Sequence, residues 1–234
     1  MYYVHFMYIM LLFSNIKIFK RNMMIISVAH TKGGVGKSTI SWNLATQLEK
    51  KYNIEIVDLD FQKTLTYTNE FRDKPFKVRN FDNLKDLNKY IANDSNDRLS
   101  IIDVGGFDSD INRMSIIMSD IVITPVSDSG TELLGLMRFE KVLDEMSKAM
   151  NEEITTTVLI NDINPKKTKL DDLIDYIEEN SHFSLFKTIL RTRADYGKAL
   201  DRGLGVAEFD KDSKAAKEFK SLVKEIKSLI EEIE

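Results

Sequence analysis

The chain of 234 residues is predicted to be an α/β protein with a doubly wound, mostly parallel sheet that helices flank on both faces. Apolar β-branched runs alternate along it with helical patterns, which is the order expected of parallel strands joined by crossover helices. A glycine-rich segment, Lys32–Thr39, separates the first such run from the first helical pattern. Aspartates end the next two runs, at Asp58 and Asp103. Since the carboxyl ends of parallel strands share one sheet edge, these features are expected to converge there.

Five runs are predicted to be buried strands, because their continuous Ile, Val and Leu content suits a sheet covered on both faces. They are Met24–Ala29, Ile54–Asp58, Leu99–Val104, Ile121–Val126 and Thr155–Asn161, with a sixth, short strand at Thr188–Leu190. Helices are predicted over Lys37–Lys51, Thr131–Met150, Leu170–Asn180 and Ala194–Asp201. A last helix, Ser213–Ile233, carries an apolar stripe that is expected to pack in the core. The stripe consists of Ala216, Phe219, Leu222, Val223, Ile226, Leu229, Ile230 and Ile233.

The composition excludes several classes of site. The chain has no cysteine, so a disulfide framework, a thiolate zinc site and a cysteine-bound iron–sulfur cluster are excluded, and a reducing cytoplasm is expected. Its three histidines lie far apart in sequence, which argues against a histidine metal site. The net charge of −4 does not suggest a nucleic-acid binder, although the segment Lys187–Lys220 has more basic than acidic residues.

The first residues form a separate region. Met1–Ile16 is nearly all apolar or aromatic, and Lys17, Lys20 and Arg21 follow it. The stretch falls short of the roughly 20 residues that span a bilayer, and its charges follow the apolar part instead of preceding it as in a secretory signal. An interfacial anchor, an extra helix and a non-functional extension remain open. We expect residues 1–22 to be a non-functional extension and residues 23–234 to form one domain.

The segment Lys32–Thr39 has the chemistry of a phosphate-binding loop. Glycines between a strand and a helix turn backbone N–H groups inward, and the helix N-terminus adds partial positive charge. Lys37 can then reach the β- and γ-phosphates of a nucleotide, and the Ser38 hydroxyl can hold Mg²⁺. Asp58, Asp60 and Asp103 are expected at the same sheet edge, where carboxylates hold Mg²⁺ and its water shell.

The loop sequence Lys32-Gly33-Gly34-Val35-Gly36-Lys37-Ser38-Thr39 resembles the deviant Walker A box of the ParA/MinD family of P-loop ATPases. The resemblance implies an ATPase that uses ATP and Mg²⁺, in which Asp58 supports the Mg²⁺ site, Asp60 positions the attacking water and Asp103 is the Walker B carboxylate. It assigns Lys32 to the nucleotide of a second subunit. Phe61 stands where the family has proline.

Later segments resemble the small plasmid-partition ParA proteins, above all Leu190–Tyr196 and the segment after Asp103. This resemblance implies an ATP-bound homodimer that binds DNA non-specifically, associates with the nucleoid in the cytoplasm, and partitions plasmid or chromosomal DNA. A centromere-binding, ParB-like adaptor would stimulate a weak basal hydrolysis. Asn161 is a candidate contact for the adenine. The candidate DNA contacts are Arg191, Arg193, Lys198 and Lys214.

Two other functions share these motifs. The first is a MinD-like membrane-associated positioning ATPase, but the acidic C-terminal tail with Glu231 and Glu232 would be repelled by anionic lipid, and no stable membrane insertion is expected. The second is a metabolic P-loop ligase that resembles dethiobiotin synthetase. Lys32 and the arginines of the segment Leu190–Tyr196 argue against a ligase.

Overall fold

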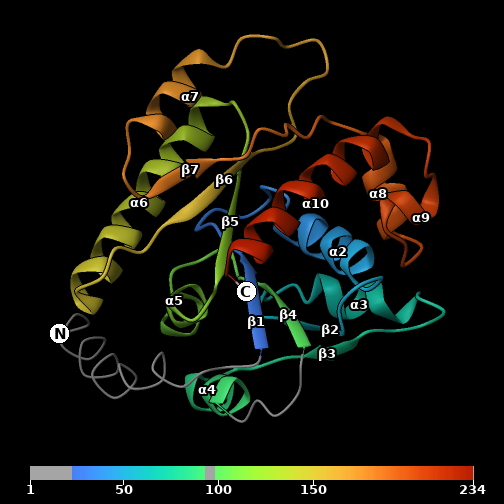
Figure 1. Cartoon of the computed structure of the whole chain (residues 1–234), viewed down its shortest axis with the longest axis horizontal. Coiled ribbons are helices and arrows are strands. Elements are labelled where there is room, and N and C mark those ends of the chain that lie inside the picture. The colour runs from blue at the N-terminus through green and yellow to red at the C-terminus, as the bar shows by residue number, and fades with distance from the viewer. Residues whose placement is uncertain (1–22, 93–97, 234) are drawn as a thin grey trace.

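The computed structural model describes residues 23–92 and 98–233, and Figure 1 shows their arrangement. Their seven strands form a single sheet in the order β3-β2-β4-β1-β5-β6-β7. Every pair of neighbouring strands is parallel, and the predicted fold class is therefore confirmed. The strands are β1 (Met23–Val28), β2 (Ile54–Asp58), β3 (Lys77–Arg79), β4 (Arg98–Asp103), β5 (Ile121–Val126), β6 (Thr156–Ile160) and β7 (Phe183–Leu185). The helices are α2 (Lys37–Leu48), α3 (Thr64–Glu70), α4 (Leu84–Ala92), α5 (Asp110–Ile117), α6 (Gly130–Met150), α7 (Asp171–Glu178), α8 (Ala194–Leu200), α9 (Val206–Phe209) and α10 (Lys214–Ile233).

Helices cover both faces of the sheet. In Figure 1, α2, α8, α9 and α10 lie together to the right of the central strands, and α6 and α7 lie to the left. Two apolar cores correspond to these layers: α4 to α7 pack on one face, whereas α2, α3 and α8 to α10 pack on the other. The right-hand layer contains the largest buried side chain, Trp42 of α2, together with Phe219 of α10. The helix that begins at the glycine-rich loop is therefore built into a core.

Most predicted elements are confirmed within one to three residues, but one strand was misplaced. β7 is Phe183–Leu185 and not Thr188–Leu190. The amides of Lys187 and Thr188 donate to the Glu225 carboxylate of α10 at 2.8 and 2.9 Å, so a side chain takes backbone groups that a strand would pair with its neighbour. The apolar stripe of α10 is confirmed except at Ile233, which is 48% exposed.

The expectations for residues 1–22 concern residues outside the described part of the chain. Within that part, no helix is both long and apolar enough to cross a lipid bilayer.

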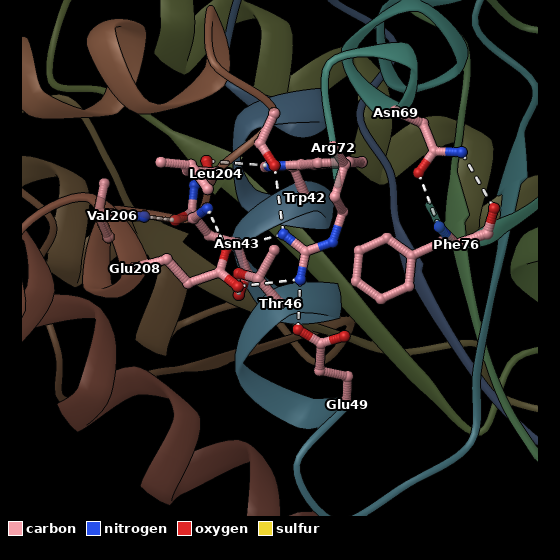
Figure 2. A network of polar contacts seen from close by, with 12 residues as sticks. Trp42, Asn43, Thr46, Glu49, Asn69, Arg72, Phe76, Leu204, Val206 and Glu208 are labelled. Carbon is pink, nitrogen blue, oxygen red and sulfur yellow. Dashed lines mark hydrogen bonds and ion pairs between the residues drawn. The ribbon is translucent and has the colours of Figure 1, made fainter. Parts of the chain in front are cut away.

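A polar cluster anchors α2 to two segments that follow it in sequence (Figure 2). The Trp42 indole N–H donates to the Leu204 carbonyl at 3.1 Å, and the Asn43 side-chain oxygen accepts from the Val206 amide at 2.7 Å. A Cβ at Gly205 would lie 2.0 Å from the Thr46 hydroxyl, so the chain can pass this close to α2 only without a side chain there.

The guanidinium of Arg72 completes this cluster. It donates to Glu49 at 2.5 Å and makes two 2.9 Å bonds to Glu208, and it lies over the Phe76 ring. Its side chain is almost fully buried, and two carboxylates compensate its charge. The bonds join α2, the end of α3 and α9, which fixes the direction in which α2 leaves the glycine-rich loop.

Candidate nucleotide-binding site

The glycine-rich loop lies between β1 and α2, at the carboxyl edge of the sheet. Gly36 immediately precedes α2 with φ of 93°, a left-handed conformation that L side chains rarely adopt. A Cβ there would also lie 2.5 Å from the amide nitrogen of Asn161, which donates to the Val35 carbonyl at 2.9 Å. Asn161 thus supports the loop from the end of β6. Its role as an adenine contact stays a prediction.

Lys37 is buried at the start of α2, and its ammonium donates to the Lys32 carbonyl at 3.1 Å. Burial lowers the pKa of this lysine, against the opposing effect of the Asp103 and Asp60 carboxylates. A Cβ on Gly106, after β4, would lie 3.1 Å from the Gly33 backbone and 3.4 Å from the Lys37 ammonium. The loop after β4 therefore closes against the glycine-rich loop, and Lys37 lies between them.

Asp103 ends β4 with its carboxylate fully buried. One oxygen, Oδ1, accepts from the Ser41 hydroxyl at 3.2 Å, and the nearby Ser38 side chain acts to lower the pKa of this carboxylate. Burial is the main cause that raises its pKa to about 7. The other oxygen, Oδ2, is buried without a hydrogen-bond partner in the described structure. A buried carboxylate oxygen without a hydrogen-bond partner is a group that could hold Mg²⁺ through its water shell, and the Mg²⁺ roles of Ser38, Asp58 and Asp103 stay predictions.

Asp58 and Asp60 follow β2 but make different contacts. Asp58 is buried, and its Oδ2 accepts from both the amide and the hydroxyl of Thr66 at 3.0 and 2.8 Å. It therefore holds the first turn of α3 against the strand end. Asp60 is half-buried, accepts from the Gln62 amide at 2.8 Å and acts electrostatically on Lys37. Of the two, Asp60 has the freer carboxylate, while the oxygens of Asp58 already accept three bonds.

The two lysines of the loop point in different directions. Whereas Lys37 is buried in the loop, the Lys32 side chain is one-third exposed and crosses to the first turn of α6. There its ammonium donates to the Glu132 carboxylate and, at 3.3 Å, to the Thr131 hydroxyl. A cleft of about 450 Å³ borders this pair, and Leu134 of α6 lines it.

The candidate DNA-binding residues are engaged to different extents. Arg191 donates to the carbonyls of Lys167 and Asn164 at 2.7 and 3.4 Å, and Arg193 pairs with Glu218 of α10 at 2.5 Å. Lys198 and Lys214 are exposed.

Sequence reasoning missed three exposed lysines of α10 and the acid that holds Lys32. Lys217, Lys220 and Lys224 are exposed on α10, and the spacing of three and four residues that puts them on one side of the helix was readable in the sequence. The pairing of Lys32 with Glu132 had no such signal, since the two residues are 100 positions apart.

Comparisons with known proteins agree with this geometry. The model of the CobQ/CobB/MinD/ParA nucleotide binding domain matches residues 26–206. The carboxysome-distribution maintenance protein A of Halothiobacillus neapolitanus is 23% identical over 198 residues, which is 82% of this chain and 90% of that protein. A 46-residue stretch is 50% identical to MJECL24 of Methanocaldococcus jannaschii, but it spans only 19% of this chain and 18% of that protein.

Among solved structures, a plasmid partition protein of Borrelia burgdorferi B31 bound to AMPPNP has a TM-score of 0.65 at 17% identity, with 86% of this chain and 97% of that one covered. This likeness concerns the fold. The family model covers most of the chain and includes the loop, Asp58, Asp60 and Asp103. The protein belongs to the CobQ/CobB/MinD/ParA family of nucleotide-binding domains.

Proposed function

We propose that the protein is an ATP-driven dimerising switch of the ParA type, which hydrolyses ATP slowly and binds DNA without sequence preference to partition or position its cargo. A ParB-like adaptor would accelerate hydrolysis and release the dimer from DNA. Similarity to proteins named for plasmid partition and for carboxysome distribution supports a positioning role.

The observation that best supports the proposal is that the side chains of Lys37 and Lys32 point in different directions. Lys37 is buried between the loop and two carboxylates, where it can bind the phosphates of the nucleotide in its own chain. Lys32 extends outward to α6 and is one-third exposed. A cation at the rim of a nucleotide site is suited to reach the phosphates held by a second copy of the chain and to stabilise charge that develops on the transferred phosphoryl group.

Exposed apolar side chains around the same edge support a dimer. Phe61 follows β2 and is 83% exposed, Phe107 follows β4, and Leu134 and Met137 lie on the first two turns of α6. Exposed large apolar side chains are typical of surfaces that a partner covers. Their position after the carboxyl ends of β2, β4 and β5 favours a second copy facing the first across the nucleotide.

Within this dimer each residue has one task. Mg²⁺, when bound with ATP, would neutralise charge on the phosphate oxygens, with Ser38 and Asp103 as its nearest protein groups. Lys37 orients the β- and γ-phosphates. Asp60 accepts a hydrogen bond from the attacking water and so holds it in line. Asp58 keeps Asp60 in place by accepting from its amide at 3.3 Å, and it also holds the start of α3 through Thr66.

For DNA, the exposed lysines of α10 are the best candidates in the described structure. Non-specific binding requires only cations that reach phosphates, with strong dependence on salt. Lys214, Lys217, Lys220 and Lys224 are exposed, whereas Arg191 and Arg193 are held by carbonyls and by Glu218. We therefore assign the first DNA contacts to α10 and Lys198, and a secondary role to the two arginines.

The test is retention of a random-sequence duplex by the purified protein with Mg²⁺ and either AMPPNP or ADP, over a series of salt concentrations. Binding is expected with AMPPNP only. The combined Lys217→Ala, Lys220→Ala and Lys224→Ala variant should lose roughly tenfold or more in affinity and show a shallower salt dependence.

A control variant with equal loss of charge, Lys50→Ala, Lys74→Ala and Lys85→Ala, should bind like the unaltered protein, since these exposed lysines lie outside α10, two in loops and one on α4. Equal binding with ADP and AMPPNP, or equal loss in both triple variants, would contradict the DNA assignment.

A further inference from the structure

His30 is a buried histidine between β1 and the glycine-rich loop to which the proposed mechanism gives no task. Its side chain is 1% exposed. Its Nδ1 accepts a hydrogen bond from the Lys32 amide at 2.9 Å. Because this nitrogen is an acceptor, the neutral ring must carry its proton on Nε2, which makes Nε2 a donor.

The ring is held rigidly in this orientation. It stacks on Phe139 of α6 with centroids 5.6 Å apart and planes 16° from parallel. On the same helix, a Cβ at Gly135 would lie 3.1 Å from the imidazole Cε1 and 3.3 Å from the Lys32 side chain. The absence of a side chain at Gly135 therefore lets both His30 and Lys32 lie directly against α6.

The second nitrogen points to a further contact. Nε2 is buried without a hydrogen-bond partner in the described structure, and so is the side-chain oxygen Oδ1 of Asn112 on α5. Both residues line the same small cavity of about 10 Å³. Buried donors and acceptors are rarely left unpaired, and a cavity of this size holds about one water molecule.

Asn112 ties this cavity to the loop after β4. Its amide nitrogen donates to the Phe107 carbonyl at 2.7 Å and to the Gly105 carbonyl at 3.4 Å. That loop closes on the glycine-rich loop at Gly106, next to Lys37. Hydrogen bonds thus join Lys32 to His30 on one side of the cavity and Asn112 to the loop that borders the phosphate site on the other.

We propose that His30 is a positioning residue for Lys32, which fixes the Lys32 backbone through Nδ1 and joins it, through Nε2 and one bridging water, to Asn112 and the loop after β4. These contacts hold the Lys32 backbone in an orientation from which its side chain can reach a second subunit. They also couple the position of the Lys32 backbone to that of the loop after β4, which borders the phosphate site. This inference rests on the proposed function only in what Lys32 does after it is positioned.

The charges that surround the ring favour its neutral form. Lys32 and Lys37 lie on the same loop, and Arg113 of α5 lines the cavity together with Asp108, with which it pairs at 2.5 Å. Burial, followed by the charges of Lys37 and Lys32, lowers the pKa of His30 to about 3. The ring therefore keeps one donor and one acceptor throughout the physiological range.

Three substitutions separate the two contacts. His30→Asn keeps a hydrogen-bond acceptor at the position of Nδ1 and loses the Nε2–H donor. His30→Gln places an amide at the position of Nε2 and loses the Nδ1 acceptor. His30→Phe keeps the stack on Phe139 and loses both the donor and the acceptor. The control is His182→Phe, since the His182 ring lies just before β7, at the far edge of the sheet from β1, and its Nδ1 hydrogen-bonds to the Ile154 carbonyl at 2.9 Å.

Steady-state ATP hydrolysis in the presence of DNA is the first readout. His30→Phe should lower kcat at least tenfold with KM changed less than twofold, because Lys37 still binds the nucleotide of its own chain. His30→Asn and His30→Gln should each be intermediate, and His182→Phe should match the unaltered protein. An unchanged kcat in His30→Phe would overturn the positioning role. An unchanged kcat in His30→Asn would overturn the link to Asn112. An unchanged kcat in His30→Gln would overturn the contact with the Lys32 amide.

The second readout does not depend on hydrolysis. Nitrogen-15 NMR of the unaltered protein should show His30 as the Nε2–H tautomer, with no titration between pH 5 and 8. An Nδ1–H tautomer, or titration in that range, would overturn the inference even if the protein dimerises and hydrolyses ATP. If the expected tautomer is present but no hydrolysis is found, the proposed function fails while the contact geometry stands.

Discussion

Lys32 donates a hydrogen bond to Glu132 within its own chain, so the lysine that we assign to a second subunit is held by an acid on α6. The Glu132 side chain is mostly buried and the Lys32 side chain one-third exposed. Formation of the proposed dimer requires Lys32 to leave this carboxylate for the partner's phosphates. The pair therefore opposes dimerisation in the single chain.

Glu132→Gln should make the ATP-dependent dimer more stable. A partly exposed ion pair contributes about 0.5 to 1 kcal/mol, and the variant no longer has to break two such pairs per dimer, so its dimer dissociation constant should be roughly fivefold to thirtyfold lower. Sedimentation equilibrium with Mg²⁺ and AMPPNP measures this constant. Asp144→Asn, which removes an exposed pair with Lys148 farther along α6, is the matched control and should change nothing. A weaker dimer in Glu132→Gln would show that the acid assists association.

Lys37→Ala should strongly weaken nucleotide binding. The ammonium is buried beside two carboxylates and would be the main cation on the phosphates. A charge-assisted hydrogen bond contributes about 1.5 to 3 kcal/mol, so the loss of at least one such bond should weaken binding roughly tenfold to a hundredfold. Isothermal titration with AMPPNP measures it, and Lys50→Ala, an exposed lysine in the turn after α2, serves as control. Binding within twofold of the unaltered protein would show that Lys37 does not contact the phosphates.

Asp60→Ala should affect hydrolysis alone, whereas Asp58→Ala should also lower the stability of the fold. The Asp60 carboxylate accepts from the local Gln62 amide, so its loss should leave the fold intact, slow hydrolysis by about a hundredfold and leave the ATP-bound dimer long-lived. Asp58 holds Thr66 through two bonds, so its loss should lower the free energy of unfolding by about 2 kcal/mol as well. Turnover and thermal unfolding are compared for both variants. Rapid turnover in Asp60→Ala would exclude the water-positioning role.

His30 should make the protein less stable in mild acid. Its pKa is about 3 in the folded chain and near 6.5 when unfolded, so between these values the unfolded chain binds more protons. As pH falls below 6.5, the free energy of unfolding should decrease, and from this residue alone by about 2 kcal/mol at pH 5. Chemical unfolding at pH 5 and pH 7.5 should show a smaller decrease in His30→Phe than in the unaltered protein. An equal decrease in both would mean that His30 is not buried as a neutral ring.

The sequence predicted those parts of the structure that depend on local pattern. The strands before the glycine-rich loop and before Asp103 were recognisable because both of their faces are buried, and the loop was recognisable because Gly36 and Lys37 have fixed positions relative to α2. The edge strand β3 was missed because its two outward residues, Lys77 and Arg79, are exposed and only Val78 packs inward.

Contacts between distant residues could not be predicted in this way. Glu132 beside Lys32, and Asn112 beside His30, come from helices that follow different strands, and their proximity depends on the strand order. Likewise, the sequence suggested Arg193 as a DNA contact, but in the structure Arg193 pairs with Glu218 of α10 at 2.5 Å. The sequence thus revealed which groups could do chemistry, while tertiary packing determined which of them are already paired.

Dimerisation by ATP is the point on which the proposed function depends most. Sedimentation velocity of the full chain, saturated with Mg²⁺ and AMPPNP and then with Mg²⁺ and ADP, tests it in one experiment, with Lys32→Ala as the matched variant. We expect twice the mass of a single chain with AMPPNP, a single chain with ADP, and a single chain in both for Lys32→Ala. A single chain with saturating AMPPNP, or an undiminished dimer in Lys32→Ala, would contradict the proposed switch.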